Sequence, residues 1–250
     1  MAQQRNLKNP PIVEAILDLS VRFATPPKPE TLGDLAKDLG ADYRPAELRR
    51  MFQIVVGNPA QAGTHTAAPP IVNSYLFRSQ DLASAVQSRA EGFTFSGLPP
   101  YGGWTDLIAK ALPIWEKYRA RFRPTRIARC SVRYLNRLML PGPHLNFDDY
   151  IVGMPQIPPE LPQGLAEFSS SYVVPLAPTG TIGRVGLSFS SKNMTDSGGV
   201  PVLFDIDILQ ECDVDPMDLP SLQAILDNLR LLKNHVFFGT LTDTAIGVFE

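Results

Sequence analysis

Hydrophobic and polar residues alternate along positions 12–23. Every second side chain from Val13 to Phe23 is apolar, and the positions between them include Glu14, Asp18 and Arg22. A period of two is typical of a β-strand that buries one face. Strand-like runs also occur at positions 48–56, 71–78, 83–95, 126–140, 166–175, 182–190 and 202–212.

Two other segments have apolar residues in steps of three and four, the spacing of one helix face. The first covers positions 104–122 and contains both tryptophans, Trp104 and Trp115; the second covers positions 219–237. Pro113 lies inside the first segment, so a kink or break is expected near positions 109–112. Short helices are expected at 31–39 and 147–152.

The two halves of the chain repeat this order of elements. The letters SVRF at 20–23 return as SVRY at 131–134, and each closing helix has a span that begins with leucine and ends with phenylalanine. We predict an α+β fold, in which a mainly antiparallel sheet packs against two long helices in two similar β-α-β-β-β-α halves. The halves are residues 1–124 and 125–250, which can form one continuous domain. Chance similarity of short segments is the alternative.

Composition and charge narrow the class of protein. The 250 residues carry a net charge of −2 and the pI is about 6.0. No apolar run approaches the roughly 20 residues of a membrane helix, and the first residues lack the apolar segment of a secretory signal. Two cysteines, Cys130 and Cys212, make no disulfide framework. We therefore expect a cytoplasmic protein without a membrane partner.

One stretch concentrates positive charge. Positions 117–137 hold 8 lysines and arginines and no acidic residue. On the predicted strand, Arg129, Arg133 and Arg137 share one face at intervals of roughly 13 Å. Arg22 lies on the matching strand of the first half. Because guanidinium groups bind oxyanions in a planar fork, these four arginines are candidate ligand-binding residues.

Acidic residues elsewhere offer a competing interpretation. Asp205 and Asp207 share a face of the strand at 202–212, and Glu14 and Asp18 share one on the first strand. If these strands neighbour the arginine strand, the charges pair inside the protein. Arg133 and Asp207 are then expected to lie close together. Asp205 and Asp207 are also a candidate metal pair, because carboxylates two apart on a strand can share Mg²⁺. The sequence shows no convincing third ligand.

Three short stretches carry a resemblance to a known family: Asn-Pro-Pro-Ile-Val-Glu-Ala at 9–15, Arg-x-x-x-Arg-Tyr-Leu-Asn-Arg at 129–137 and Phe-Asp-Ile-Asp at 204–207. With the helix that bears the tryptophans, they resemble a sporadically distributed family of uncharacterised bacterial proteins of about this length. Family members usually have a leucine-glycine-like pair where this chain has Cys130 and Ser131. The resemblance implies a bacterial cytosolic protein and supplies no catalytic residue.

We find no sequence signature of a nucleophile, a zinc site or a phosphate-binding loop. We therefore favour a non-enzymatic binding or interaction protein without a cofactor, whose arginine-bearing sheet face binds an acidic protein or an anionic small molecule. The alternative is an enzyme for a phosphate-bearing substrate that uses the arginines and the Asp205–Asp207 pair. The acidic pI disfavours nucleic acid. If the arginines prove to be paired internally, the loops at 57–70 and 141–162 are the next candidates.

Overall fold

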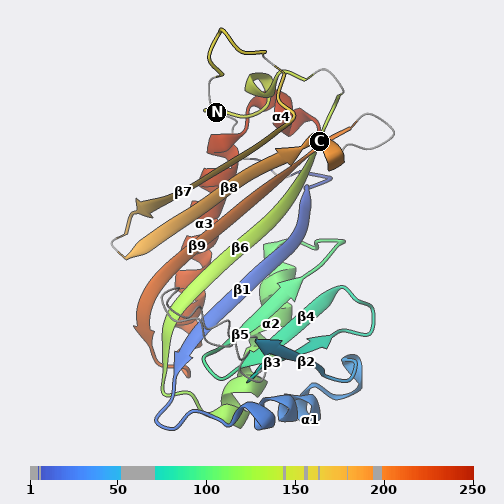
Figure 1. Ribbon diagram of the computed structural model, residues 1–250. Helices are drawn as coiled ribbons and strands as arrows, with labels where there is room; N and C mark the ends of the chain where they lie inside the picture. Colours follow the sequence, from blue (N-terminus) through green and yellow to red (C-terminus); the bar gives the residue numbers. More distant parts are fainter. Residues whose placement is uncertain are drawn as a thin grey trace, which may run out of the picture.

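The structure, a computed structural model, describes residues 5, 7–51, 71–142, 145–154, 157–162, 164–178, 180–193 and 199–250. Within this part of the chain, 9 strands form one antiparallel sheet (Figure 1). In sheet order these are β2 (Glu47–Met51), β3 (Ile71–Arg78), β4 (Ser84–Arg89), β5 (Gly92–Gly97), β1 (Ile12–Arg22), β6 (Arg126–Leu140), β9 (Val200–Val214), β8 (Thr181–Ser190) and β7 (Glu167–Leu176).

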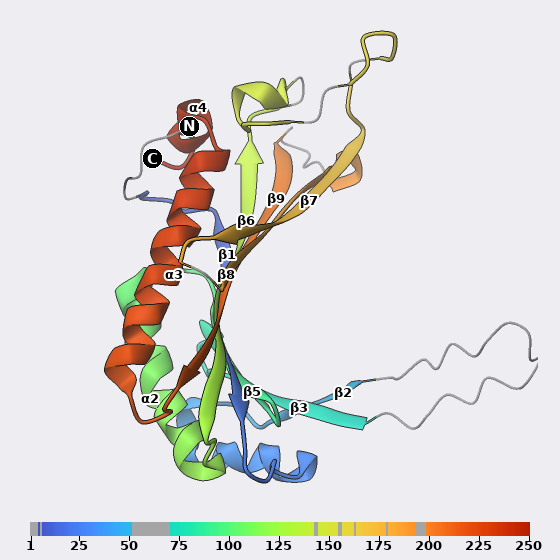
Figure 2. The same cartoon turned by 90° about the vertical axis from the view of Figure 1, so that its left-hand side faces the viewer.

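Two long helices, α2 (Trp104–Phe122) and α3 (Leu219–Thr240), cover one face of the sheet. Figure 2 shows that the sheet curves away from them, so its opposite face is concave and neither long helix lies on it. The shorter helical segments are the 3₁₀ turns Pro29–Leu35, Gly40–Asp42, Phe147–Asp149 and Ser191–Asn193 and the helices α1 (Ala36–Leu39) and α4 (Asp243–Gly247). The predicted α+β fold with two long helices is confirmed.

The core lies between the helices and the convex face of the sheet. Leu17 and Leu19 of β1 are fully buried, as the period-two pattern predicts. Trp115 of α2 is also fully buried and packs its ring against Phe93, while Leu226 of α3 is buried over the second half. One continuous hydrophobic cluster includes residues from both halves. The two halves thus share a sheet and a core.

Two element predictions need correction. The run at 83–95 is a hairpin of β4 and β5, because the chain reverses at Ala90–Glu91 and pairs Arg89 with Gly92. The kink or break predicted near positions 109–112 is not a break, since α2 continues through Pro113. Pro113 is exposed on the outer side of the helix, where the loss of one backbone hydrogen bond is tolerated near water.

Other boundaries shift by smaller amounts. The predicted strand at 48–56 is β2, and its positions 52–56 lie outside the described residues. The predicted helix at 147–152 is a single 3₁₀ turn, and the one at 31–39 begins as a 3₁₀ turn before α1. Among the described residues, the first half has one strand more than the second, because the run at 83–95 forms two strands.

The strand order bears on the predicted duplication. Outward from the centre of the sheet, the first half runs β1-β5-β4-β3 and the second runs β6-β9-β8-β7. In each half a long helix follows the last strand, and in the second half the short α4 comes after it. This order is what a duplication would produce, apart from the additional β2, and the duplication stays a prediction. Within the described residues, no helix combines the length and apolar character needed to span a membrane.

Candidate functional site

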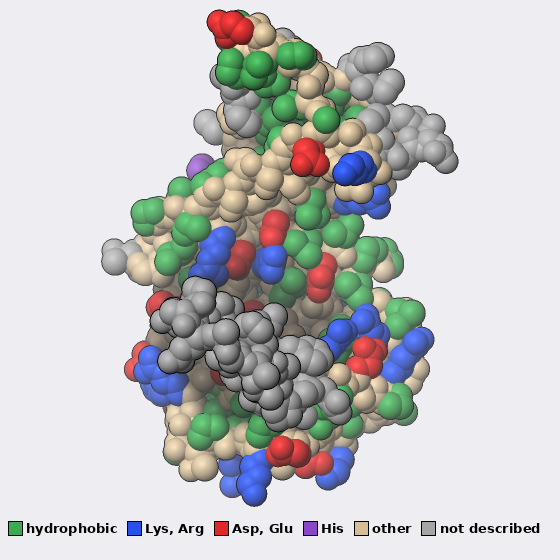
Figure 3. Space-filling model, in the orientation of Figure 1, with side chains coloured by type: hydrophobic (Ala, Val, Ile, Leu, Met, Phe, Trp, Pro, Cys, Tyr) green, Lys and Arg blue, Asp and Glu red, His purple; other side chains and the backbone are tan. Residues whose placement is uncertain are grey.

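The concave face of the sheet gathers charged and polar side chains from both halves. Figure 3 views this face and shows lysine, arginine and acidic side chains close together at its centre. Strand alternation explains the arrangement: on β6, Cys130, Val132 and Tyr134 turn into the core, so Arg129, Arg133 and Arg137 turn to the concave side. The predicted common face of the three arginines thus holds.

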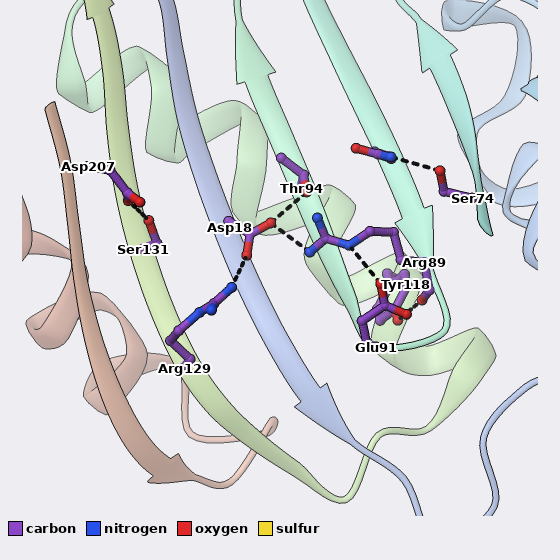
Figure 4. Close-up of polar contacts among 10 residues, drawn as sticks. Asp18, Ser74, Arg89, Glu91, Thr94, Tyr118, Arg129, Ser131 and Asp207 are labelled. Carbon is purple, nitrogen blue, oxygen red and sulfur yellow. Dashed lines mark hydrogen bonds and ion pairs between the residues drawn. The ribbon is translucent and has the colours of Figure 1, made fainter. Parts of the chain in front are cut away.

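Asp18 of β1 is the hub of one cluster on this face (Figure 4). Its carboxylate accepts a hydrogen bond of 2.6 Å from the Arg89 guanidinium and one of 2.7 Å from the Thr94 hydroxyl. Arg129 forms an ion pair with the other Asp18 oxygen at 3.5 Å. The Asp18 side chain is only 15% exposed, so the two arginines balance a largely buried charge.

The reach of Arg89 depends on a glycine. Gly92 stands opposite Arg89 in the sheet, and a Cβ at Gly92 would lie 2.7 Å from the guanidinium and 2.5 Å from the Leu19 carbonyl oxygen. Without that Cβ, the Arg89 side chain crosses β5 and meets Asp18 on β1. The Tyr118 hydroxyl donates to the Arg89 carbonyl from the helix side at 2.8 Å and fixes the strand end.

A second cluster joins β6, β9 and β8. Arg133 donates two hydrogen bonds to the Asp205 carboxylate, at 2.9 and 2.5 Å, and this contact raises the pKa of the arginine. Asp207 accepts from the Ser131 hydroxyl at 2.5 Å and pairs with Arg184 at 3.3 Å.

The expected pairing of Arg133 with Asp207 is therefore half right. The two residues are direct neighbours in the β6–β9 register, but the guanidinium of Arg133 turns to Asp205. The register gives the reason. Asp207 stands between Arg133 and Arg184, whereas Asp205 stands between Leu135 and Gly186. The diagonal contact leaves each carboxylate with one arginine.

The four predicted arginines do not form one site. Arg22 lies opposite Arg126 in the strand register, at one end of β1 and β6. Arg137 is near the other end of β6. Arg129 and Arg133 lie between these two ends; Arg129 contacts Asp18 and Arg133 contacts Asp205. Two other cations of the 117–137 stretch contact acidic residues elsewhere: Arg121 binds Asp38 and Arg126 binds Asp213.

Arg137 stands apart from this internal pairing. Its side chain is exposed and has no ion pair or side-chain hydrogen bond among the described residues. It lines a depression of about 420 Å³ together with Ser188, Ser190 and Asn193. A free guanidinium beside hydroxyl and amide groups is chemically suited to an oxyanion.

The candidate metal pair is engaged in protein contacts. Asp205 and Asp207 accept hydrogen bonds from Arg133, Ser131 and Arg184, so a cation would have to displace these donors. No group of three or more His, Cys, Asp or Glu side chains within the described residues is placed to hold a metal ion. The loop at 57–70 lies outside the described residues, and the loop at 141–162 is described in part.

Sequence reasoning missed Arg89 and Arg184, which complete the two clusters. Arg184 carried a usable signal, because it is the charged member of an otherwise small or apolar strand at 182–190. The sequence hides the place of Arg89, because its strand and the next one read as a single strand-like run at 83–95. Its contact with Asp18 also crosses an intervening strand, which the order of residues does not show.

Neither a scan of protein-family models nor a search of curated proteins finds a match for this chain. The fold and the site define an α+β protein with a charge-paired concave sheet face, at whose edge Arg137 is exposed and has no ion pair among the described residues.

Proposed function

We propose that this protein is a non-enzymatic interaction protein and that its concave sheet face binds an acidic segment of a partner protein. The observation that carries the proposal is Arg137, an exposed arginine beside Ser188 and Ser190 that has no ion pair or side-chain hydrogen bond within the described part of the chain. The bacterial, cytosolic setting implied by the family resemblance belongs to the same proposal.

The rest of the face supports binding more than chemistry. Three of its carboxylates, Asp18, Asp205 and Asp207, are held by arginines and hydroxyls, so these three are not free to exchange a proton with a substrate. Paired charges on a curved surface fix the positions of donors and acceptors, which favours specificity for one partner over another. Exposed Leu203, the direct neighbour of Arg137 on β9, adds an apolar contact beside the charge.

Affinity capture from the native host tests this proposal. Wild-type protein should retain a discrete partner, and Arg137→Glu should lose most of it while unfolding at nearly the same denaturant concentration, because exposed substitutions usually change stability by under about 0.5 kcal/mol. Lys117→Glu is the matched control: it reverses the same charge at an exposed position of α2 and should retain the partner. Equal retention by all three proteins would contradict the proposal.

A further inference from the structure

A pocket of about 520 Å³ lies on the helix side of the molecule, away from the concave face. Four parts of the chain form its wall: the residues up to the start of β1, the start of α2, the C-terminal half of α3 and the core side of β6. The volume is in the range of small-molecule sites in proteins. Apolar and aromatic side chains, including Pro11, Trp104 and Phe237, form much of the lining.

Lys233 of α3 is the unusual member of this wall. It is only 8% exposed, and no described residue forms a hydrogen bond or an ion pair with its ammonium group. The Nζ atom lies 4.1 Å from the centre of the Tyr134 ring, whose hydroxyl is 2.7 Å from that of Tyr101. Burial, with a contribution from nearby Arg230, lowers the pKa of Lys233 to about 7.

The charge of the described lining is one-sided. It includes Arg5, Lys8, Arg230 and Lys233 but neither aspartate nor glutamate. Arg5 is neutralised by Glu250 at 2.6 Å, whereas Arg230 lies over the Trp104 ring at 6.0 Å. Two carboxylates border the wall, Asp227 at 2.6 Å from the Trp104 indole nitrogen and Glu250 on Arg5, but Lys233 has no carboxylate partner among the described residues. An anion beside Lys233 would therefore meet an uncompensated positive charge. A partly desolvated cation strengthens such a contact.

The backbone around the pocket is held in place. The Asn9 amide donates to the Phe249 carbonyl at 3.1 Å, and the Arg137 amide donates to the Pro11 carbonyl at 2.8 Å. At the start of α2, Gly103 has a positive φ of 96° and provides no side-chain cap for the first turn. The free amides of this turn add positive potential at the pocket wall.

Two stretches singled out in the sequence meet here. Pro10 and Pro11 come from the stretch at 9–15, and Tyr134 and Asn136 come from the stretch at 129–137. Lys233 itself interrupts the apolar stripe of α3, in which Leu222, Leu226, Leu229 and Phe237 are buried. A lysine at a core position of a helix is costly unless its charge is compensated.

We propose that this pocket binds a small organic carboxylate with an apolar or aromatic body, and that the carboxylate contacts the ammonium group of Lys233. The apolar wall would take the body of the ligand, and the lysine would supply the charge-assisted hydrogen bond. This site is separate from the concave face, so the proposal does not depend on the partner proposed for Arg137.

Calorimetric titration with matched probes tests the site. The probes are benzoate, 2-naphthoate and indole-3-acetate, each compared with its neutral amide, which has nearly the same shape. A charge-assisted contact should make at least one carboxylate bind about tenfold or more tightly than its amide. Fluorescence of Trp104 gives a second readout at the pocket wall, with Trp104→Phe separating its signal from that of buried Trp115.

Two variants decide whether Lys233 is responsible. Lys233→Met removes the charge and keeps the length of the side chain, and it should reduce the preference for the carboxylate to less than about twofold. Lys110→Met, at an exposed lysine of α2, should leave the preference unchanged. Thermal melts establish that both variants fold. If no carboxylate is preferred over its amide, or if the preference persists in Lys233→Met, the proposal is overturned.

Discussion

At the scale of single residues, Asp18 links an arginine from the first half of the chain to one from the second. It holds Arg89 at 2.6 Å and Arg129 at 3.5 Å, and both its side chain and that of Arg89 are less than one-fifth exposed. Asp18→Asn should lower the free energy of unfolding by roughly 3 kcal/mol, because it removes the carboxylate charge that both partly buried arginines contact. Denaturant unfolding measures this loss.

Glu91 provides the control for that substitution. It lies 4.0 Å from Arg89 but is 68% exposed, so solvent screens the pair and Glu91→Gln should change stability by under about 1 kcal/mol. Equal losses in the two variants would show that burial does not set the strength of the network.

Lys233 makes a prediction about pH. Its pKa is about 7 in the folded protein, compared with an ordinary value of 10.5. Between these values the unfolded chain binds more protons than the folded one, so this residue makes the free energy of unfolding increase with pH. Wild type should therefore gain stability relative to Lys233→Met from about pH 7 to 10. A constant difference over this range would show that Lys233 has an ordinary pKa.

The face of each arginine could be predicted from the sequence, but its partner could not. Alternation along β6 is a local property, and it correctly placed Arg129, Arg133 and Arg137 on one side. The choice of Asp205 by Arg133 depends on which side chains flank each aspartate in a register of three strands. The Lys233 pocket could not be predicted, because its wall combines residues from the first segment of the chain, from β6 and from both long helices.

At the scale of elements, α2 contains a proline that does not break it. Pro113 is exposed, so Pro113→Ala restores a backbone donor without removing buried surface. The free energy of unfolding should rise by roughly 1–2 kcal/mol. Alanine is much the better helix former, and this gain exceeds the cost of making the unfolded chain more flexible. Thermal unfolding followed by circular dichroism checks this.

Pro220 is the matched position. It is also exposed, but it lies in the first turn of α3, where a proline costs no hydrogen bond. Pro220→Ala should give no gain in stability or a small loss. A lower melting temperature for Pro113→Ala would mean that α2 needs the proline.

Long periodic elements were the most predictable. The bounds of α2 and β6 agree with the pattern, because both elements are long, with 19 and 15 residues. The β4–β5 hairpin was missed since Ala90 and Glu91, which make the turn, are not typical turn residues. Only the following Gly92 hinted at it.

At the scale of the whole molecule, the strand order on the two sides of the β1–β6 pair is equivalent. If the halves arose by duplication, superposing β1, β3–β5 and α2 on β6, β7–β9 and α3 should bring 20–23 onto 131–134. A register in which these segments do not coincide would count against duplication even with the same strand order.

The central claim is that the concave face, and not the helix face, is the surface that binds a partner. Two exposed leucines allow a matched test: Leu203 beside Arg137 on the concave face, and Leu231 on α3. A photo-crosslinking amino acid placed at each position in the native host should capture a discrete partner from position 203 and not from 231. Arg137→Glu should abolish that product. Capture from position 231 alone, or capture from 203 that is unchanged by Arg137→Glu, would contradict the account.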